Sequence, residues 1–194
     1  EGKQLPYIDE LLSVLTEDVE MLNLNIFTGD VDFMRESTGL VKVPLYKENE
    51  EKGGFTTVLL DMHVDSSNLK INQTYDDPVW REIVQDIRFR QAVSLAVDRE
   101  EMIETLYYGF ASLPTVSVPE DLIARDLDRA NALLDEMGLD ERDADGWRLG
   151  PDGERFEFLI ETGAQAPDLA PAAELAGEYL KDVGIFTTVK QIDS

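Results

Sequence analysis

The chain has 194 residues, of which 43% are hydrophobic and 8% aromatic, enough for one domain or two small ones with a real core. Its 41 acidic and 17 basic residues give a formal net charge of -24, which argues against binding to nucleic acid or to an anionic membrane surface, because both need clustered Lys and Arg. The sequence has no cysteine, which excludes disulfides and thiolate metal sites, and no apolar run that approaches the roughly 20 residues of a transmembrane helix.

The first elements that the sequence predicts are a helix, a turn and a short strand. Apolar residues recur at helical spacing through residues 7–27, and Thr16 is a candidate internal cap for a helix that begins at Glu17. Residues 28–30 are typical of a helix stop and turn. The alternating residues 31–33 favour a short strand.

The next stretch predicts a loop followed by extended chain. Residues 47–54 are polar and end in two glycines, which predicts a surface loop. Residues 55–64 are rich in β-formers and predict a strand. Residues 66–68 break that pattern, and residues 69–72 resume it.

Three consecutive helices are predicted in the middle of the chain. An aspartate caps the first of them, and Pro78 occupies its first turn, where the missing N–H costs nothing. Residues 86–109 then form two helices that meet at Asp98, which can cap the second one while Glu101 reaches back. The second helix stops at Gly109. The apolar face of the helix before Asp98 consists of Phe89, Ala92, Val93, Ala96 and Val97.

The last third predicts a helix and then a strand–helix–strand unit. Residues 126–137 form the helix, and residues 154–161 alternate as a strand does. Asp168 caps a helix that runs to Val183, and residues 185–192 are a second β-rich run. A right-handed crossover follows if the two strands are parallel neighbours.

Several phrases resemble one family of transport receptors. The segment 69–110 contains I-N-Q-T-Y-D-D-P-V-W-R-E-I-V-Q-D and then F-R-Q-A-V-S-L-A-V-D-R-E-E-M-I. This run resembles a hallmark of the family 5 extracellular solute-binding proteins of ABC transporters, which include peptide-, dipeptide- and nickel-binding receptors. The phrases T-G-D-V-D-F and R-A-N-A-L-L-D-E-M-G-L are also similar to segments of that family.

The resemblance implies an α/β fold that is part of a two-lobed architecture of the periplasmic-binding-protein type II kind, with a mixed sheet and flanking helices. Family members are typically more than twice as long, and this sequence matches their middle. The resemblance places residues 1–68 in the first lobe, residues 69–194 in the main part of the second lobe, and the crossover between them near residues 65–72. If the first lobe is incomplete, its strands have unpaired edges that dimerisation would cover.

The function that the resemblance implies is the capture of a small solute, a peptide in the first place, by hinge closure between the lobes. The partners are then the permease and ATPase subunits of an ABC importer. The location is the extracellular face of the membrane or the periplasm, with a lipid anchor outside this stretch as the expected membrane attachment. No cofactor and no catalytic residue is implied, and an oligosaccharide or a metal chelate stays open as the solute.

The candidate ligand-binding residues are those of the crossover. Short polar side chains and exposed backbone suit an extended ligand that has a repeating donor–acceptor edge. Ser66, Ser67, Asn68 and Asn72 are of this type. The alternative is that these residues only form a turn and a strand end.

An acidic loop offers the one metal hypothesis. Glu141, Asp143, Asp145, Gly146 and Asp152 fall on positions 1, 3, 5, 6 and 12 of a calcium loop. The first and last of these depart from the preferred residue types, so a tight Asp/Gly turn is the favoured interpretation and no metal site is predicted. An acidic calcium-dependent interaction module remains the alternative function.

The other residues that invite a functional role have plainer interpretations. Arg90 is interpreted as a tie between neighbouring loops, Arg99 as a solvated residue, and the tryptophans Trp80 and Trp147 as packing residues. His63 has no nucleophile or second histidine around it in the sequence, and no catalytic motif occurs. The acid excess indicates a solvated surface, with high-salt adaptation or cation binding as sharper alternatives.

Overall fold

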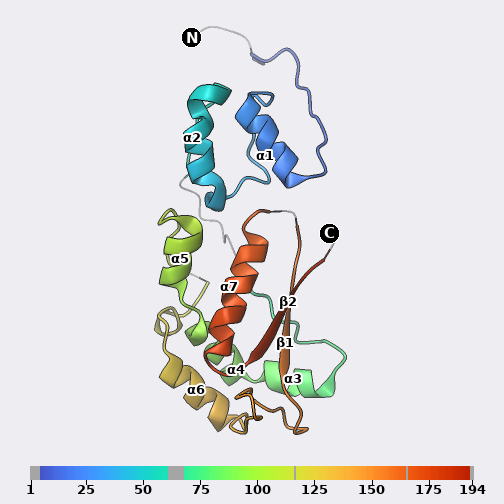
Figure 1. Cartoon of the computed structure of the whole chain (residues 1–194), viewed down its shortest axis with the longest axis vertical. Helices are drawn as coiled ribbons and strands as arrows, with labels where there is room; N and C mark the ends of the chain where they lie inside the picture. The colour runs from blue at the N-terminus through green and yellow to red at the C-terminus, as the bar shows by residue number, and fades with distance from the viewer. Residues whose placement is uncertain (1–4, 61–67, 116, 165, 193–194) are drawn as a thin grey trace.

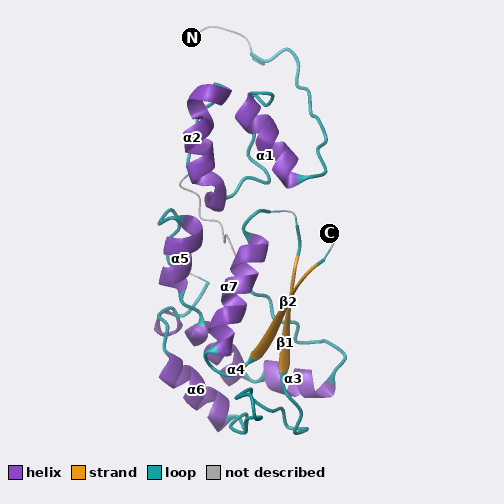
Figure 2. Ribbon diagram, viewed as in Figure 1, coloured by secondary structure: helices purple, strands orange, loops and turns teal. Residues whose placement is uncertain are grey.

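The structure is a computed structural model that describes residues 5–60, 68–115, 117–164 and 166–192. None of the helices in these ranges has the length and apolar character needed to span a membrane. The elements in chain order are α1 (Val19–Thr28), η1 (Leu40–Lys42), α2 (Val43–Gly53), α3 (Pro78–Gln85), α4 (Ile87–Ala96), α5 (Arg99–Tyr107), η2 (Glu120–Leu122), α6 (Leu127–Glu136), β1 (Glu157–Thr162), α7 (Leu169–Lys181) and β2 (Phe186–Gln191). A two-stranded sheet lies beside α7 (Figures 1 and 2), and the outward side chains of β1 are exposed.

The predicted strand–helix–strand unit is present at the end of the chain. β1 and β2 pair in parallel, with Glu157 opposite Phe186, and α7 connects them and packs on both. The side chains of Phe158 and Ile160 point into the core, and those between them point outward, as the alternating sequence predicts. A mixed sheet was expected, and the described residues contain only this parallel pair of strands.

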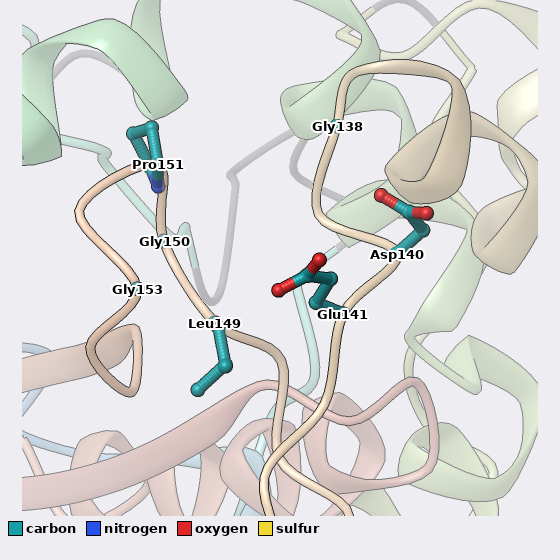
Figure 3. A pocket seen from close by; sticks show the side chains of 7 residues that line it. All are labelled: Gly138, Asp140, Glu141, Leu149, Gly150, Pro151 and Gly153. Atoms are coloured by element: carbon teal, nitrogen blue, oxygen red, sulfur yellow. The ribbon is translucent and has the colours of Figure 1, made fainter.

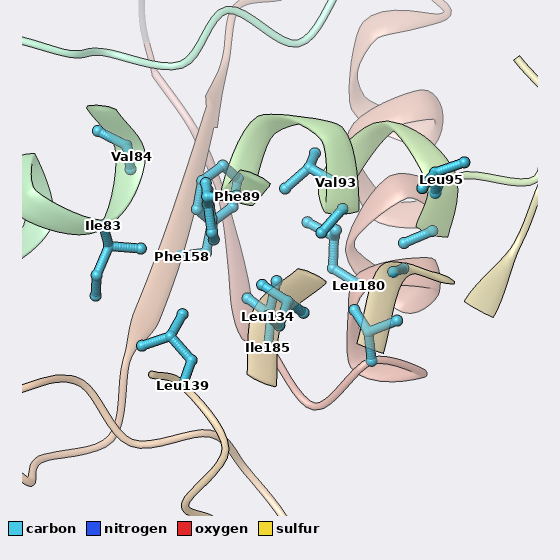
Figure 4. Packing of buried hydrophobic residues seen from close by; sticks show 14 of the residues in the cluster. Ile83, Val84, Phe89, Val93, Leu95, Leu134, Leu139, Phe158, Leu180 and Ile185 are labelled. Atoms are coloured by element: carbon cyan, nitrogen blue, oxygen red, sulfur yellow. The ribbon is translucent and has the colours of Figure 1, made fainter. Parts of the chain in front are cut away.

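A single hydrophobic core joins α3, α4, α6, α7 and the sheet (Figure 4). Phe89 of α4 is fully buried at its centre. The Phe89 ring meets those of Phe156 and Phe158, with centroids 5.6 and 5.9 Å away. Of the residues predicted to form one helix face, Phe89, Ala92, Val93 and Ala96 are buried in this core, whereas Val97 follows the end of α4 and is only partly buried.

Aspartates begin most of the helices. In each case the carboxylate accepts an N–H bond from the first turn, which satisfies a donor that has no partner within the helix. These caps are Asp18, Asp77, Asp86, Asp98 and Asp126, with carboxylate–nitrogen distances of 2.8–3.0 Å. The expected cap at Asp168 is wrong, because that side chain makes no capping bond and instead accepts the hydroxyl of Tyr107 at 3.2 Å.

The cap at Asp98 gives a measurable prediction. Replacing Asp98 with alanine is expected to lower the free energy of unfolding by about 1 kcal/mol, because the N–H of Glu101 loses its acceptor at the junction of α4 and α5. Asn is as good a cap as Asp, so Asp98→Asn should cost much less in a denaturant titration. An equal loss in both variants would instead assign the effect to the ion pair of Asp98 with Arg125.

The N-terminal part differs from the prediction of helical structure through residues 7–27 with an internal cap at Thr16. α1 begins only at Val19, and its cap is Asp18 rather than Thr16. Residues 5–17 have no regular structure, and Leu11 and Leu15 are 88% and 89% exposed. An apolar stripe needs a surface to pack on, and among the described residues none covers this one. The predicted stop is confirmed by Gly29, whose φ of 81° is left-handed.

The predicted loop over 47–54 is wrong, because α2 runs through it. Its Lys and Glu residues are good helix formers, and its buried face packs on α1. Tyr46 donates to the Oδ1 of Asn23 at 2.5 Å, and its ring lies 5.7 Å from that of Phe27. Burial raises the pKa of Tyr46 to about 12. The polar composition marked the exposed side of a helix, and its two glycines marked its end.

Two predicted strands have no counterpart in the described chain. Residues 31–33 and 55–60 form no strand, and residues 61–64 of the second prediction lie outside the described residues. A strand needs a neighbouring strand to which its backbone can hydrogen-bond. In the described residues the only two strands are β1 and β2, and they pair with each other. β-forming residues alone therefore did not decide the structure there.

Candidate functional site

The candidate site is the chain that leads from α2 to α3. Its described residues are 55–60 and 68–77, and we call them the crossover segment (Figure 1). Of the predicted ligand-binding residues, Asn68 and Asn72 lie in it and are exposed. Ser66 and Ser67 lie outside the described residues, as does His63.

The beginning of the crossover segment is fixed to α2 by a charged group. The carboxylate of Glu50 accepts the N–H of Thr57 at 2.7 Å, and Lys47 donates both to Glu50 and to the carbonyl of Thr57 at 2.8 and 2.9 Å. The hydrogen bond from Lys47, followed by that from Thr57, lowers the pKa of Glu50 to about 2. Glu50 is therefore ionised at neutral pH, and it holds this backbone through a charge-assisted bond.

The end of the crossover segment is fixed to α3. The indole N–H of Trp80 donates to the carbonyl of Asn72 at 2.6 Å, and Gln85 donates to the carbonyl of Gln73 at 2.8 Å. The Oδ1 of Asn72 accepts the N–H of Thr74 at 3.0 Å, which is an Asx turn. The carboxamide oxygen of Asn72 thus supports its own turn. Residues 68–70 and 73–76 are exposed, while Ile71 is partly buried against the core.

Trp80 connects this turn to the core. Its ring stacks on Phe158 with centroids 5.3 Å apart and lies 5.7 Å from Phe156. The packing role predicted for Trp80 is confirmed. Its indole N–H also positions the backbone of Asn72, which the sequence pattern did not indicate. Trp147 also packs as predicted, with its ring edge-on to that of Phe186 at 5.4 Å.

Replacing Trp80 with phenylalanine tests the positioning role. The change keeps an aromatic ring in the core and removes the bond to Asn72, so we expect a loss of about 1 kcal/mol in the free energy of unfolding. Amide hydrogen exchange at residues 72–75 should become faster than in the parent protein. Trp147→Phe is the matched control and should leave that exchange unchanged. Unaltered exchange at 72–75 in the Trp80 variant would contradict the role.

The two arginines of interest are ties within the fold. Arg90 donates to the carbonyls of Val84 and Gln85 at 2.7 and 2.9 Å, which confirms it as a tie between neighbouring segments. Arg99 was expected to be solvated, and this is wrong. It donates to the carbonyls of Ser94 and Ile123 at 2.8 and 3.0 Å, and burial lowers its pKa. The charge of Arg99 stabilises a loop that packs beside α5.

The acidic loop is the predicted tight turn. The Oδ1 of Asp143 accepts the N–H groups of Asp145 and Trp147, both at 2.9 Å, and Gly146 has a φ of 92°. Arg155 binds the carboxylates of Asp143 and Asp145 at 2.6 and 2.7 Å. Hydrogen bonds and ion pairs thus occupy the carboxylates of Asp143, Asp145 and Asp152, three of the four that would wrap a cation. Within the described ranges, no group of three or more acidic or histidine side chains is arranged to hold a metal.

A small cavity lies beside this loop (Figure 3). Its volume is about 270 Å³, just below the range of roughly 300–1,000 Å³ that ligand pockets occupy. Asp140 and Glu141 line one side, opposite the turn of Pro151 in the close-up. The full lining is Gly138, Asp140, Glu141, Leu149, Gly150, Pro151 and Gly153. It shares no residue with the crossover segment, so it is not the predicted ligand site.

Curated relatives resemble nearly all of this chain. A probable ABC transporter-binding protein from Deinococcus radiodurans is 22% identical over 204 residues, which cover 98% of this chain and 34% of that protein. The oligopeptide-binding protein AppA from Bacillus subtilis is 24% identical and covers 93% of this chain and 33% of its own length. The chain thus spans about a third of the length of these relatives.

Solved structures agree on the fold. An oligopeptide-binding protein OppA superimposes with a TM-score of 0.59 at 28% identity, over 92% of this chain and 31% of its own. The structure of Bacillus subtilis AppA in complex with a nonapeptide gives 0.64 at 20% identity, over 91% of this chain and 34% of its own. The predicted α/β fold, as part of a larger two-lobed binding protein, is therefore confirmed.

The family is settled by a match along the whole described chain. The model of the bacterial extracellular solute-binding proteins, family 5 Middle, matches residues 2–194. This agrees with the phrases over 69–110 that resemble the family and with the superimposed structures. The chain belongs to the family 5 bacterial extracellular solute-binding proteins, a class of binding proteins rather than of enzymes.

Proposed function

We propose that this chain is part of the solute-binding component of an ABC importer and that its solute is a peptide. The observation that carries the proposal is the family match over residues 2–194. The peptide is favoured because relatives named as oligopeptide-binding proteins cover more than nine-tenths of this chain. Sugars are the second solute class to test, because a periplasmic alpha-galactoside-binding protein of Rhizobium meliloti is 27% identical over 78% of this chain.

We infer that residues 1–68 belong to one lobe and residues 69–194 to the main part of the other. The packing supports this division, since α1 and α2 bury their apolar faces against each other, while one core runs through α3–α7 and the sheet. The crossover segment joins the two and is anchored on both sides. Closure of the lobes around a ligand is then a hinge motion.

The proposed ligand contacts are Asn68 and Asn72 of the crossover segment, together with Ser66 and Ser67, which lie between its two described parts. The exposed backbone of the segment suits the donor–acceptor edge of an extended peptide, and no covalent chemistry is needed. The permease and ATPase subunits are the proposed partners. The proposed location is the outer face of the membrane or the periplasm, with attachment through a lipid anchor outside these residues.

Calorimetric titration of the full-length protein with mixed peptides and then with oligosaccharides tests the proposal. We expect saturable peptide binding that is the same in calcium and in chelator. The double change Asn68→Ala and Asn72→Ala should weaken it about tenfold, or ~1.4 kcal/mol. Asn49→Ala on α2 is the matched control, since the Asn49 amide donates within its own helix.

Other outcomes have definite meanings. Binding of sugars but not of peptides would overturn the proposal that the solute is a peptide, and it would leave the proposal of a transport receptor standing. Failure to bind either solute class, together with a large stabilisation by calcium, would overturn the receptor in favour of the calcium-dependent module. Unchanged peptide affinity in the double variant would remove Asn68 and Asn72 from the site.

A further inference from the structure

Basic and acidic side chains make different contacts in this fold. Arg90, Arg99 and Arg142 direct donors to backbone carbonyls, and Arg148 is buried. These guanidinium groups are occupied in holding segments together. Most acidic side chains of the described chain, by contrast, make no ion pair. Arg148 is the only buried basic residue among those described, and the excess of 41 acidic over 17 basic residues leaves the surface with net negative charge.

Like charges also lie next to each other on helices. Residues three or four positions apart on a helix are neighbours, and two acids at that spacing repel each other. Three helices carry such pairs: Glu48 with Glu51 on α2, Glu100 with Glu104 on α5, and Glu174 with Glu178 on α7. All six side chains belong to exposed residues. Only Glu178 has an ion-pair partner, Lys181, among the residues that the structure describes.

Dissolved salt acts differently on repulsions and on ion pairs. The Debye length falls from about 10 Å at 0.1 M to about 3 Å at 1 M, so molar salt removes repulsion between exposed charges that are not in contact. The ion pairs of this fold have separations up to 3.9 Å, comparable to that shorter length, and they are weakened less. With a net charge of -24, the repulsions outweigh the ion pairs, and compaction of the chain brings the repelling groups together.

We propose that this protein is adapted to a medium of molar salt and that its folded state is stabilised by monovalent cations screening the whole surface. No individual acidic group is a binding site in this proposal, because the effect comes from the summed charge. It is independent of the proposed transport function, since it concerns the folding of the chain rather than the solute.

The test is thermal unfolding of the full-length protein in sodium chloride and in potassium chloride from 0.1 to 2 M. We expect the Tm to rise by at least about 5 °C over this range, and by similar amounts with either cation. A Tm that stays constant or falls between 0.1 and 1 M would overturn the proposal. Calorimetric ligand titration is a separate measurement, so the failure of one proposal leaves the other standing.

A matched pair of variants assigns the effect to this chain. Glu48, Glu51, Glu100, Glu104 and Glu174 are replaced together by Gln in one variant and by Asp in the other. The Gln variant should have a higher Tm at 0.1 M and a smaller rise with salt, because it lacks five repelling charges. The Asp variant keeps those charges, so it should show the parent's rise whatever its starting Tm. Equal rises in the parent and the Gln variant would show that salt acts through solvent effects, which also overturns the proposal.

Discussion

Replacing Arg148 with methionine is expected to lower the free energy of unfolding by about 2–3 kcal/mol. The Arg148 side chain is 1% exposed and connects three segments. It donates to the carbonyl of Val183 at 2.7 Å, to the Oδ1 of Asn131 at 2.7 Å and to Asp135 at 2.6 Å, and it also bonds the carbonyl of Leu139. Methionine fills much of the volume but makes none of these bonds. Arg142 still donates to the Oδ1 of Asn131 and to the carbonyl of Val183, at 3.1 and 3.4 Å, and the Asp135 carboxylate is 53% exposed. The carbonyl of Leu139 loses its Arg148 donor, and a buried acceptor without a partner is costly.

Two variants separate burial from charge in this result. Arg129→Met removes an exposed ion pair with Asp121 and should cost no more than about 1 kcal/mol. Arg148→Lys keeps the positive charge but cannot reach acceptors on several sides, so its cost should lie between those of the other two. The measurement is urea titration with the slope checked for two-state behaviour. A loss below about 1 kcal/mol in Arg148→Met would show that water satisfies these acceptors.

Replacing Phe89 with alanine is the second change with a large expected effect, about 3–5 kcal/mol. Phe89 is 0% exposed, and its ring is the contact between α4 and the aromatic residues Phe156 and Phe158. Removing the ring exposes these neighbours to a cavity that they cannot fill without moving the strand. The loss includes the transfer free energy of the ring and the cost of the cavity.

The control for Phe89 is Phe110, which is 47% exposed and follows α5. Phe110→Ala should cost less than about 1 kcal/mol in the same urea titration, because little buried area is lost. Phe89→Leu leaves a smaller cavity and should fall between the two alanine variants. If Phe89→Ala and Phe110→Ala cost the same, the core does not centre on the α4–β1 contact.

The sequence predicted the second part of the chain better than the first, and the reason lies in the packing partners. From Pro78 onward, caps such as Asp77 and Asp98 act within one helical turn, and the apolar faces meet other segments of the same stretch. Local signals and tertiary contacts agree there. Before residue 60, leucines such as Leu11 and β-formers such as Val58 have no covering partner in the described chain, so the predicted helix and strand did not form.

The candidate site shows a similar limit. The residue types of Asn68 and Asn72 indicated exposed polar groups, and the structure places both on the surface. The anchors were not predicted, because Trp80 and Glu50 act on backbone seven or eight residues away in the sequence. No periodicity or motif reports such a contact. Arg99 was misread for the same reason, since its acceptor at Ile123 is brought close only by the fold.

The contact between Tyr107 and Asp168 has a consequence for the order of folding. A side chain that caps its own helix lets the first turn form from local residues alone. α7 has no such cap, and the carboxylate at its start is instead held by a hydroxyl 61 positions earlier in the chain. That bond requires closure of a long loop, and long loops close late because of their entropy. We therefore expect the first turn of α7 to become stable only after α5 has docked, whereas the middle of α7 does not depend on this bond.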